Sequence, residues 1–455
     1  MRASVVINTY NRAASLPATL DGLRRQVGAE FEVIVVNGPS TDGTDELLAQ
    51  WEDRLRVVRF DEVHLGRSRN LGIAAAAGDV VAFIDDDAIP EPDWVAGLLA
   101  AYDAPEVAGA GGLVFDHTGV ELQYRYSACT RIGEPRFDLG PPFDEYTYPQ
   151  ADPFVYLQGT NCSFRRTALV EVGGFDETIE YYLDETELCM QLIDAGHRLV
   201  PLAGAAVHHH YLPGHLRADR TTWTHPYPIV KNRTYFALSH GTATRSPGEV
   251  LIELSTWANG VIASGTRELR RSGADEDRVA DFVDQVNRGL ADGVELGTAA
   301  ERRSVVLPAP VESDFLPFAT VGDERSRRYC FVSGEYPPQV GGVGRFTSDT
   351  ARGLAAAGHE VHVVTRSDSN HRIEVEDGVW VHRVPVQDRY VDGLEARCCA
   401  TTWSTAPRCT TRSTACTGVV RCRWCPPRSG TARACFRRST VASPRSPRSS
   451  RRSRR

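Results

Sequence analysis

Short apolar runs alternate with amphipathic segments over roughly the first 110 residues of the chain. The apolar runs predict strands at residues 4–8, 31–36, 55–60 and 80–84. The segments between them predict helices at residues 13–27, 45–51 and 68–77, and the first of these carries apolar residues at helical spacing, Leu16, Leu20 and Leu23. Strands and helices in this order predict an α/β fold, with a parallel sheet covered by helices.

Beyond this region the pattern changes several times. A stretch rich in Pro, Gly, Tyr and Asp at residues 111–160 predicts long loops with short strands, which suits a region that sets specificity. The predictions that follow in chain order are helices at 167–172 and 185–195, a strand at 200–207, mostly helical structure at 217–300, a linker at 301–325, and a new strand–helix–strand pattern from Tyr329.

No apolar run approaches the ~18 residues that a membrane-spanning helix needs. The first eight residues enter a strand pattern directly and lack the layout of a signal peptide. We therefore expect a cytoplasmic location, with peripheral association at the inner face of a membrane left open.

Three consecutive carboxylates, Asp85, Asp86 and Asp87, follow the apolar strand at residues 80–84. Ligands bind at the carboxyl ends of strands in an open α/β sheet. Adjacent carboxylates repel one another unless a cation or solvent compensates them. The triplet therefore indicates either a metal site or a solvated acidic turn.

Polar residues also follow the first and second predicted strands. After the first strand stand Thr9, Tyr10, Asn11 and Arg12. Asn37 follows the second strand and leads into a turn rich in Gly, Ser and Thr at residues 38–44. Such groups can hold a nucleotide base and ribose, and they equally serve as ordinary turn and cap residues.

Two arginines, Arg67 and Arg69, stand with Asn70 at a predicted helix start. Arginines at such a place can meet a diphosphate, or they can form a solvated face. Asp184 and Glu185 begin another predicted helix, where a carboxylate can remove a proton from a hydroxyl or can simply cap the helix.

Three adjacent histidines end the strand predicted at residues 200–207. Strand alternation puts His208 and His210 on the same side, where an imidazole can ligate a divalent metal. Histidines on a surface without any ligand are the alternative.

The order and content of these segments resemble the family 2 glycosyltransferases, of GT-A fold, over residues 1 to about 240. The matching segments are residues 5–12, 40–44, 69–73, 78–87, 159–161, 173–177, 184–188 and 195–197. Each is short, but together they occur in the family's order. The chain departs from the family at Asn37 and Gly38, where acids are usual, which we interpret as an altered nucleotide preference.

The resemblance implies a role for each candidate residue. Asp85 and Asp86 would face the nucleotide sugar together with the polar strand-end residues, with Arg69 and with Asn70. Asp87 would ligate Mn²⁺ or Mg²⁺, with His208 or His210 as a further ligand. Glu185, next to Asp184, would be the catalytic base.

The activity implied is metal-dependent, inverting transfer of a sugar from a nucleotide-diphospho-sugar to an acceptor hydroxyl on a glycan or a lipid-linked molecule, in the synthesis of cell-surface polysaccharide or glycolipid. Two alternatives remain: a non-catalytic sugar-nucleotide-binding or assembly subunit, and a retaining transferase on the same fold. A glycosidase is disfavoured, because the acids lie at strand ends beside nucleotide-type turns.

The second strand–helix–strand pattern, at residues 326–396, resembles the first half-domain of the family 4 glycosyltransferases, of GT-B fold. Its glycine-rich loop, GGVG at residues 341–344, leads into a predicted helix. We expect no transferase activity from this segment alone, because that family needs a second Rossmann-like domain to hold the nucleotide sugar. The expected organisation is a GT-A domain at 1–240, a helical extension and linker at 241–325, the GT-B segment at 326–396, and a tail at 397–455.

The tail has a different composition from the rest of the chain. It holds 15 arginines, no acidic residue and seven of the 11 cysteines. Cys422 and Cys425 have zinc-knuckle spacing, but the tail has no histidine to complete such a site. We expect a disordered tail from a shifted reading frame, with a basic segment that binds nucleic acid or anionic lipid as the alternative.

The formal net charge of -8 includes these arginines, so the rest of the chain is more acidic than that figure indicates. An acidic body argues against nucleic acid as a partner of the folded part.

Overall fold

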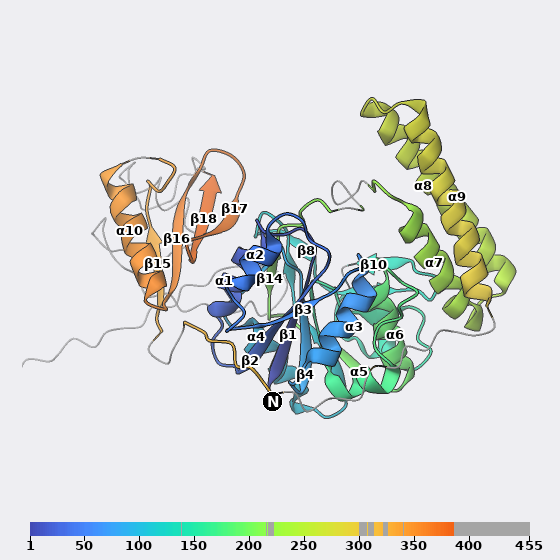
Figure 1. The fold of residues 1–455 in the computed structure, drawn as a ribbon, viewed down its shortest axis with the longest axis horizontal. Helices are drawn as coiled ribbons and strands as arrows, with labels where there is room; N and C mark the ends of the chain where they lie inside the picture. The colour runs from blue at the N-terminus through green and yellow to red at the C-terminus, as the bar shows by residue number, and fades with distance from the viewer. Residues whose placement is uncertain are drawn as a thin grey trace, which may run out of the picture.

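The computed structural model describes residues 1–137, 139–214, 216, 223–299, 307, 314–321, 326–339 and 341–385. Two α/β units and a helical arm make up this part of the chain (Figure 1). The prediction of a disordered tail at 397–455 lies outside the described residues.

A seven-stranded sheet forms the centre of the first unit, with strand order β13-β6-β12-β4-β1-β2-β3. Its strands are β1 (Ala3–Thr9), β2 (Phe31–Asn37), β3 (Arg56–Arg59), β4 (Val80–Ile84), β6 (Val107–Gly111), β12 (Asn161–Arg165) and β13 (Arg198–Pro201). The parallel arrangement predicted for the first strands is confirmed, because β2 and β4 both pair in parallel with β1. The structure adds one antiparallel strand, β12, between β4 and β6. This strand follows a long excursion through loops and small sheets instead of a single crossover helix.

Helices cover both faces of this sheet, as Figure 1 shows. They are α1 (Leu16–Arg24), α2 (Thr44–Ala49), α3 (Leu65–Ala75), α4 (Trp94–Leu99), α5 (Arg166–Val172) and α6 (Asp184–Asp194), with the short 3₁₀ turn η1 (Ala100–Asp103) after α4. Successive strand residues point to opposite faces, so Val5 packs with α1, α2 and α4 while Val6 packs with α3, α5 and α6. Leu16, Leu20 and Leu23 are fully buried, which confirms the predicted apolar stripe of α1.

Two small sheets follow the carboxyl ends of β4 and β6. One has the order β5-β14-β7-β8 and the other β10-β9-β11. Their strands are β5 (Ala88–Pro90), β7 (Val114–Phe115), β8 (Leu122–Tyr124), β9 (Ser127–Cys129), β10 (Pro135–Phe137), β11 (Phe154–Tyr156) and β14 (Val207–His209), with the 3₁₀ turn η2 (Asp144–Tyr146) between β10 and β11. The short strands predicted at 111–160 are confirmed. The single strand predicted at 200–207 is wrong, because the chain turns after Pro201 and the two halves join different sheets, as β13 and β14.

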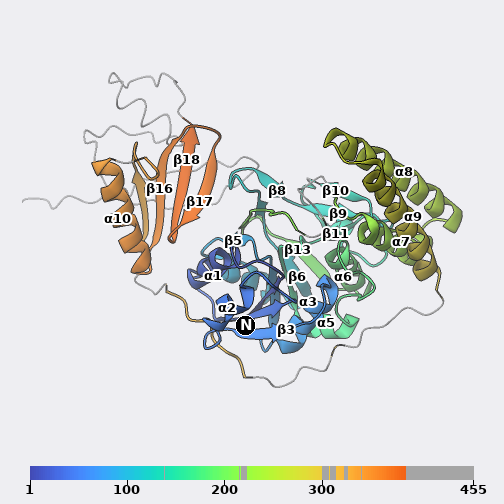
Figure 2. The same ribbon diagram turned by 45° about the horizontal axis from the view of Figure 1, so that its top comes forward.

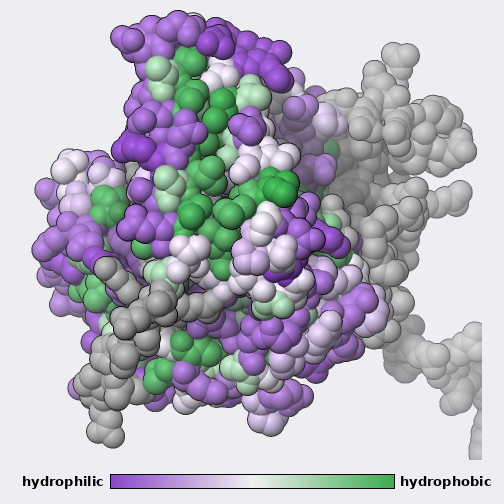
Figure 3. Space-filling model, turned by 90° about the vertical axis from the view of Figure 1, so that its right-hand side faces the viewer, coloured by the Kyte–Doolittle hydropathy of each residue, from purple (hydrophilic) through white to green (hydrophobic). Residues whose placement is uncertain are grey.

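The helical arm consists of α7 (Tyr227–His240), the 3₁₀ turn η3 (Gly241–Ala243), α8 (Pro247–Arg271) and α9 (Glu276–Thr298). A capping box between Ser246 and Glu249 starts α8, and the Asp275 side chain caps α9. Apolar side chains form a stripe along the outer face of the arm in Figure 3. Leu251 and Ile252 of α8 are exposed apolar residues. No helix among the described residues combines the length and the apolar content needed to cross a bilayer.

Close packing of α9 on α7 leads to a testable expectation at Gly293. A Cβ atom there would lie 2.6 Å from the Lys231 carbonyl oxygen and 2.5 Å from Thr234 Cβ. Gly293→Ala should therefore lower the melting temperature, since overpacking of this kind costs about 1–3 kcal/mol. Gly260→Ala on α8 is the matched control, because a Cβ there meets nothing within 4 Å and alanine favours a helix. Thermal unfolding of both variants checks this, and an unchanged Gly293→Ala protein would contradict close packing.

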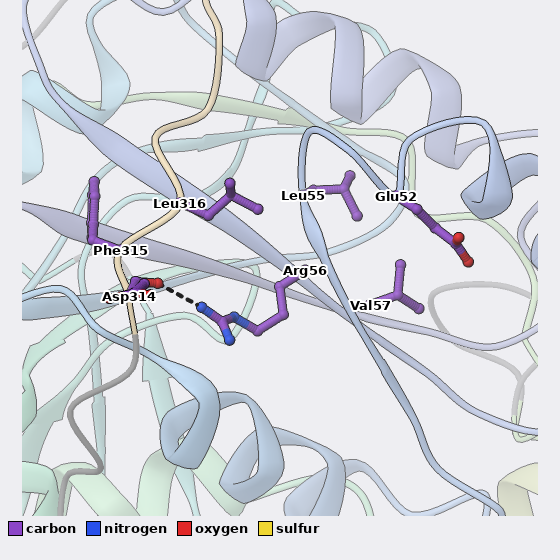
Figure 4. A pocket seen from close by; sticks show the side chains of 7 residues that line it. All are labelled: Glu52, Leu55, Arg56, Val57, Asp314, Phe315 and Leu316. Atoms are coloured by element: carbon purple, nitrogen blue, oxygen red, sulfur yellow. Dashed lines mark hydrogen bonds between the residues drawn. The ribbon is translucent and has the colours of Figure 1, made fainter.

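Residues 314–321, here called the strap, run from the arm side of the chain along the first unit to the second. Phe318 packs against Phe31 and Trp51, with ring centroids 5.7 and 6.2 Å away. Its backbone N–H donates to the Phe31 carbonyl oxygen at 2.8 Å. The strap also forms one wall of a cavity of about 450 Å³ (Figure 4), where the Arg56 guanidinium donates to the Asp314 carbonyl oxygen at 2.9 Å.

The second unit is a four-stranded sheet with strand order β15-β16-β18-β17 and one helix packed on it. Its elements are β15 (Arg328–Val332), α10 (Gly342–Ala356), β16 (Glu360–Ser367), β17 (Arg372–Glu376) and β18 (Val379–Pro385). The strands β15, β16 and β18 are parallel, and β17 is antiparallel to β18. The predicted restart of an α/β pattern near Tyr329 is confirmed.

Candidate active site

A cavity of about 690 Å³ opens at the carboxyl ends of β1 and β4. The residue groups that line it come from far apart in the sequence. They are residues 8–12 at the end of β1, 85–87 after β4, 64–65 and 68–69 at the start of α3, 183–186 at the start of α6, and 209 with 211–214 at the end of β14. The sequence predicted that strand ends would bring such groups together, and most of the predicted residues do line this cavity.

Asp85, Asp87 and His209 form one cluster on the cavity wall. One ligand atom from each lies within 4.8 Å of the others. The His209 Nε2 atom is 3.1 Å from Asp87 and 3.5 Å from Asp85, and its Nδ1 atom lies 3.0 Å from the Gln123 side-chain oxygen. Carboxylate oxygens and an imidazole nitrogen suit Mn²⁺ or Mg²⁺, so the donor set fits a divalent cation.

The structure corrects the predicted histidines. His208 points the other way, with its ring stacked on Phe115 at 5.1 Å and its Nε2 atom 3.2 Å from Glu91. His210 likewise lies outside the cluster and outside the cavity lining among the described residues. Strand alternation correctly separates His209 from its two neighbours, but alternation alone does not say which set faces the cavity.

The two buried acids of the triplet, Asp86 and Asp87, have pKa values shifted in opposite directions. Burial acts to raise the pKa of Asp87, but the hydrogen bond and the charge of His209 outweigh it and lower that pKa to about 2. Burial, together with the Asp87 charge, raises the pKa of Asp86 to about 7. Asp86 lies 3.3 Å from the Arg12 guanidinium, which it holds at the cavity. Asp87 is therefore the ionised member that can serve as a ligand.

Asp184 and Glu185 lie at the other side of the cavity, at the first turn of α6. Arg69 donates to the Asp184 carboxylate at 2.6 Å and lies 3.8 Å from Glu185. Burial and the neighbouring Asp184 charge raise the pKa of Glu185 well above its ordinary value. Asp184 is therefore engaged by the arginine, while Glu185 binds a proton more tightly than an ordinary glutamate does.

Two residues before α6 adopt a backbone conformation that is rare for their type. Tyr182 and Leu183 have φ values of 71° and 69°. Left-handed backbone is costly for residues other than glycine, and such strain is concentrated at functional sites. The turn brings the first residues of α6 to the cavity, and no feature of the sequence signals it.

Two parts of the chain match known protein families. Residues 4–173 match the family model for glycosyl transferase family 2, and residues 341–408 match that for a glycosyl transferase 4-like domain. The chain is 31% identical over 319 residues to validoxylamine A glucosyltransferase of Streptomyces hygroscopicus subsp. jinggangensis, which covers 63% of this chain and 72% of the relative. The chain belongs to glycosyltransferase family 2.

A second relative and one solved structure show the same similarity. Glucosyl-dolichyl phosphate glucuronosyltransferase of Haloferax volcanii is 28% identical over 233 residues, which is 46% of this chain and 69% of that protein. The crystal structure of S. aureus TarS 1-349 with UDP-GlcNAc has 16% identity and a TM-score of 0.42, and covers 64% of this chain and 82% of TarS. The match to the family 2 model and to the 31% identical relative confirms the predicted family and makes the protein a glycosyltransferase. Its sheets and covering helices confirm the predicted α/β fold class.

Two asparagines that were predicted to bind the donor in this family 2 glycosyltransferase, Asn37 and Asn70, form hydrogen bonds within the protein instead. The Asn37 amide is bonded to Asp45 and Ser40, and Asn70 is bonded to the backbone of Phe175 on both sides of its amide. Neither asparagine is part of the cavity lining. Asn37 ends β2 and Asn70 lies within α3, and the sequence does not reveal the partners that their amides find.

Arg69 lies at the cavity but is 3% exposed and is engaged by acids instead of facing a diphosphate freely. Its guanidinium lies over the rings of Phe83 and Phe175, at 5.6 and 5.2 Å. In this family 2 glycosyltransferase, Arg69 therefore positions the carboxylates at the start of α6. By contrast, Thr9, Tyr10, Asn11 and Arg12 all line the cavity, where the sequence placed them.

Sequence reasoning missed part of the cavity wall. His209 and Gln123 were not singled out, nor were most aromatic residues on the wall, which are Phe60, Tyr124, Phe137, Tyr156, Tyr181, Tyr182, Tyr211 and Trp223. The aromatic content of residues 111–160 was the available signal, but a single aromatic residue in a predicted loop does not indicate whether it lines a binding site.

Proposed function

We propose that this family 2 glycosyltransferase moves a sugar from a nucleotide-diphospho-sugar to an acceptor hydroxyl in a metal-dependent reaction that inverts the anomeric centre. The observation that carries the proposal is the arrangement of one cavity, with Asp85, Asp87 and His209 on one wall and Glu185 on another. A cation bound by that trio would offset the negative charge of the departing diphosphate.

Other residues around the cavity are proposed to activate the acceptor and to position the reacting groups. Glu185 accepts a hydrogen bond from the acceptor hydroxyl and takes its proton as the oxygen attacks, because its raised pKa makes it a stronger base than an ordinary glutamate. Asp184, bonded to Arg69, fixes the start of α6. Arg12, held by Asp86, adds positive charge to the wall beside the donor.

The acceptor is proposed to be a polyhydroxylated ring compound, as in a glycan or a lipid-linked sugar. Aromatic side chains on the wall, among them Tyr124 and Phe137 with ring centroids 5.5 Å apart, offer flat apolar faces for such rings. A glucosyl donor is the first to test, because the validoxylamine A relative is a glucosyltransferase.

The test is a donor screen with the purified full chain. Release of nucleoside diphosphate is measured for a panel of UDP-, dTDP- and GDP-sugars, before and after chelation with EDTA. We expect release from one donor class, loss of release with EDTA, and recovery on addition of Mn²⁺ or Mg²⁺. NMR of the product should show an inverted anomer.

Each part of the proposal has its own contrary result. Turnover that survives chelation contradicts metal dependence, and a retained anomer contradicts inversion. Binding of a nucleotide sugar without any turnover would favour a non-catalytic subunit.

A further inference from the structure

The second unit lies against the first along its edge strand β17, which faces the β7–β8 hairpin in Figure 2. The Ile373 backbone N–H donates to the Thr118 carbonyl oxygen at 2.7 Å. On the other side of the contact, the Arg25 guanidinium donates to the Ala355 carbonyl oxygen at 3.1 Å. The strap, which precedes this unit in the sequence, is hydrogen-bonded to the first unit through Phe318 and Val321.

The contact is close enough to exclude a side chain at Gly119. This residue has a φ of 70°, and a Cβ there would lie 2.6 Å from Ile373 Cβ and 3.1 Å from His208 Nδ1. Only glycine fits this position without a shift of the neighbouring side chains. The hairpin, β17 and His208 therefore form one packed junction.

His208 lies between the two units. Its ring stacks on Phe115 of β7 at 5.1 Å and packs against Trp380 of β18 at 4.9 Å. His208 is 6% exposed and Trp380 is 5% exposed. Each unit thus supplies one of the two aromatic contacts of this imidazole.

The adjacent residue on the same strand is His209, which faces the cavity. The strand that carries both, β14, has three residues and pairs with the short strands β5 and β7. So short a strand has few backbone hydrogen bonds to fix its position. Side-chain packing of His208 on one face therefore contributes to where His209 lies on the other.

We propose that Trp380 is a positioning residue, and that the second unit braces β14 so that His209 stays beside Asp85 and Asp87. The second unit then supports the reaction of the first unit and does not itself transfer a sugar. The inference rests on the proposed function in one respect, namely the cation at the trio.

The test compares Trp380→Ala and Trp380→Phe in the full chain. Two quantities are measured: the Mn²⁺ dissociation constant, by electron paramagnetic resonance titration without substrate, and the amide hydrogen exchange of a peptide covering residues 203–212. We expect the alanine variant to bind Mn²⁺ roughly tenfold more weakly and to exchange faster in that peptide. The phenylalanine variant should stay close to the unchanged protein, because a ring remains against His208.

Phe346→Ala is the matched control, since Phe346 lies on α10 of the same unit and is 71% exposed. Both quantities should be unchanged in it. If Trp380→Ala does not fold, Trp380→Leu keeps an apolar side chain while it removes the ring, and the same weakening is expected.

If Trp380→Ala changes neither Mn²⁺ binding nor amide exchange, the proposal that the second unit holds β14 in place is wrong. If the unsubstituted chain binds no Mn²⁺, the proposed cation site is wrong. The exchange measurement then still tests whether Trp380 holds β14 in place. The two ideas can therefore fail separately.

Discussion

Glu185→Gln should abolish sugar transfer while the protein remains folded. Glutamine has the same shape as glutamate but cannot take a proton from the acceptor hydroxyl, so kcat should fall by roughly 10²- to 10⁴-fold. KM for the donor should change little, because Glu185 is proposed to act on the acceptor. Steady-state kinetics with the donor found in the screen measures both constants.

The same substitution should also raise stability at neutral pH. Burial raises the pKa of Glu185, so the folded state binds its proton more tightly than the unfolded state does. Stability therefore falls as pH rises from the unfolded pKa to the folded one, and the ionised carboxylate destabilises the fold above that range. Glutamine removes this charge, and the melting temperature at pH 7 should increase.

The raised pKa also fixes the direction of the pH profile. A base must be deprotonated to act, so log(kcat/KM) should decline on the acid side at a pH above about 4.3, the ordinary value for glutamate. Glu171→Gln on the outer face of α5, where the side chain is 58% exposed, is the matched control and should leave kinetics unchanged. Normal turnover by Glu185→Gln would remove the base from the proposed mechanism.

Asp87→Asn should weaken Mn²⁺ binding and reduce transfer by at least about two orders of magnitude. His209 lowers the pKa of Asp87 to about 2, so this carboxylate is ionised throughout the working pH range. Asparagine keeps the shape but removes the charge that a cation requires. Titration with Mn²⁺ and transfer assays at increasing metal concentration measure the two effects.

Excess Mn²⁺ should rescue part of the lost activity, because the other members of the cluster, Asp85 and His209, remain. Asp103→Asn, an exposed acid of η1 away from the cavity, is the control and should bind Mn²⁺ as the unsubstituted chain does. Metal affinity that is equal in Asp87→Asn and in the control would contradict a cation at this cluster.

The strong periodic signals in the sequence predicted the fold well. The apolar runs gave the parallel strands of the first unit, and the spacing of Leu16, Leu20 and Leu23 gave the buried face of α1. The acidic triplet was placed correctly at a strand end, since burial of β4 on both faces leaves its carboxyl end as the place where polar residues meet solvent and ligand.

The details that failed depend on contacts between distant residues. Asn37 carries the chemistry of a base contact, yet its amide is engaged by Asp45 and Ser40. The identity of the histidine at the cluster depends on how β14 is seated between β5 and β7, which local alternation does not encode. The left-handed turn before α6 is imposed by tertiary structure on residues that do not favour it.

Phe318 extends the first unit's hydrophobic core with a side chain that follows the helical arm in the sequence. It belongs to the same buried cluster as Phe31 and Leu48, and it stacks on Trp51. A chain shortened at residue 240 would expose these aromatic faces to water and invite aggregation. A truncated first unit that folds on its own should therefore end at residue 321 or later.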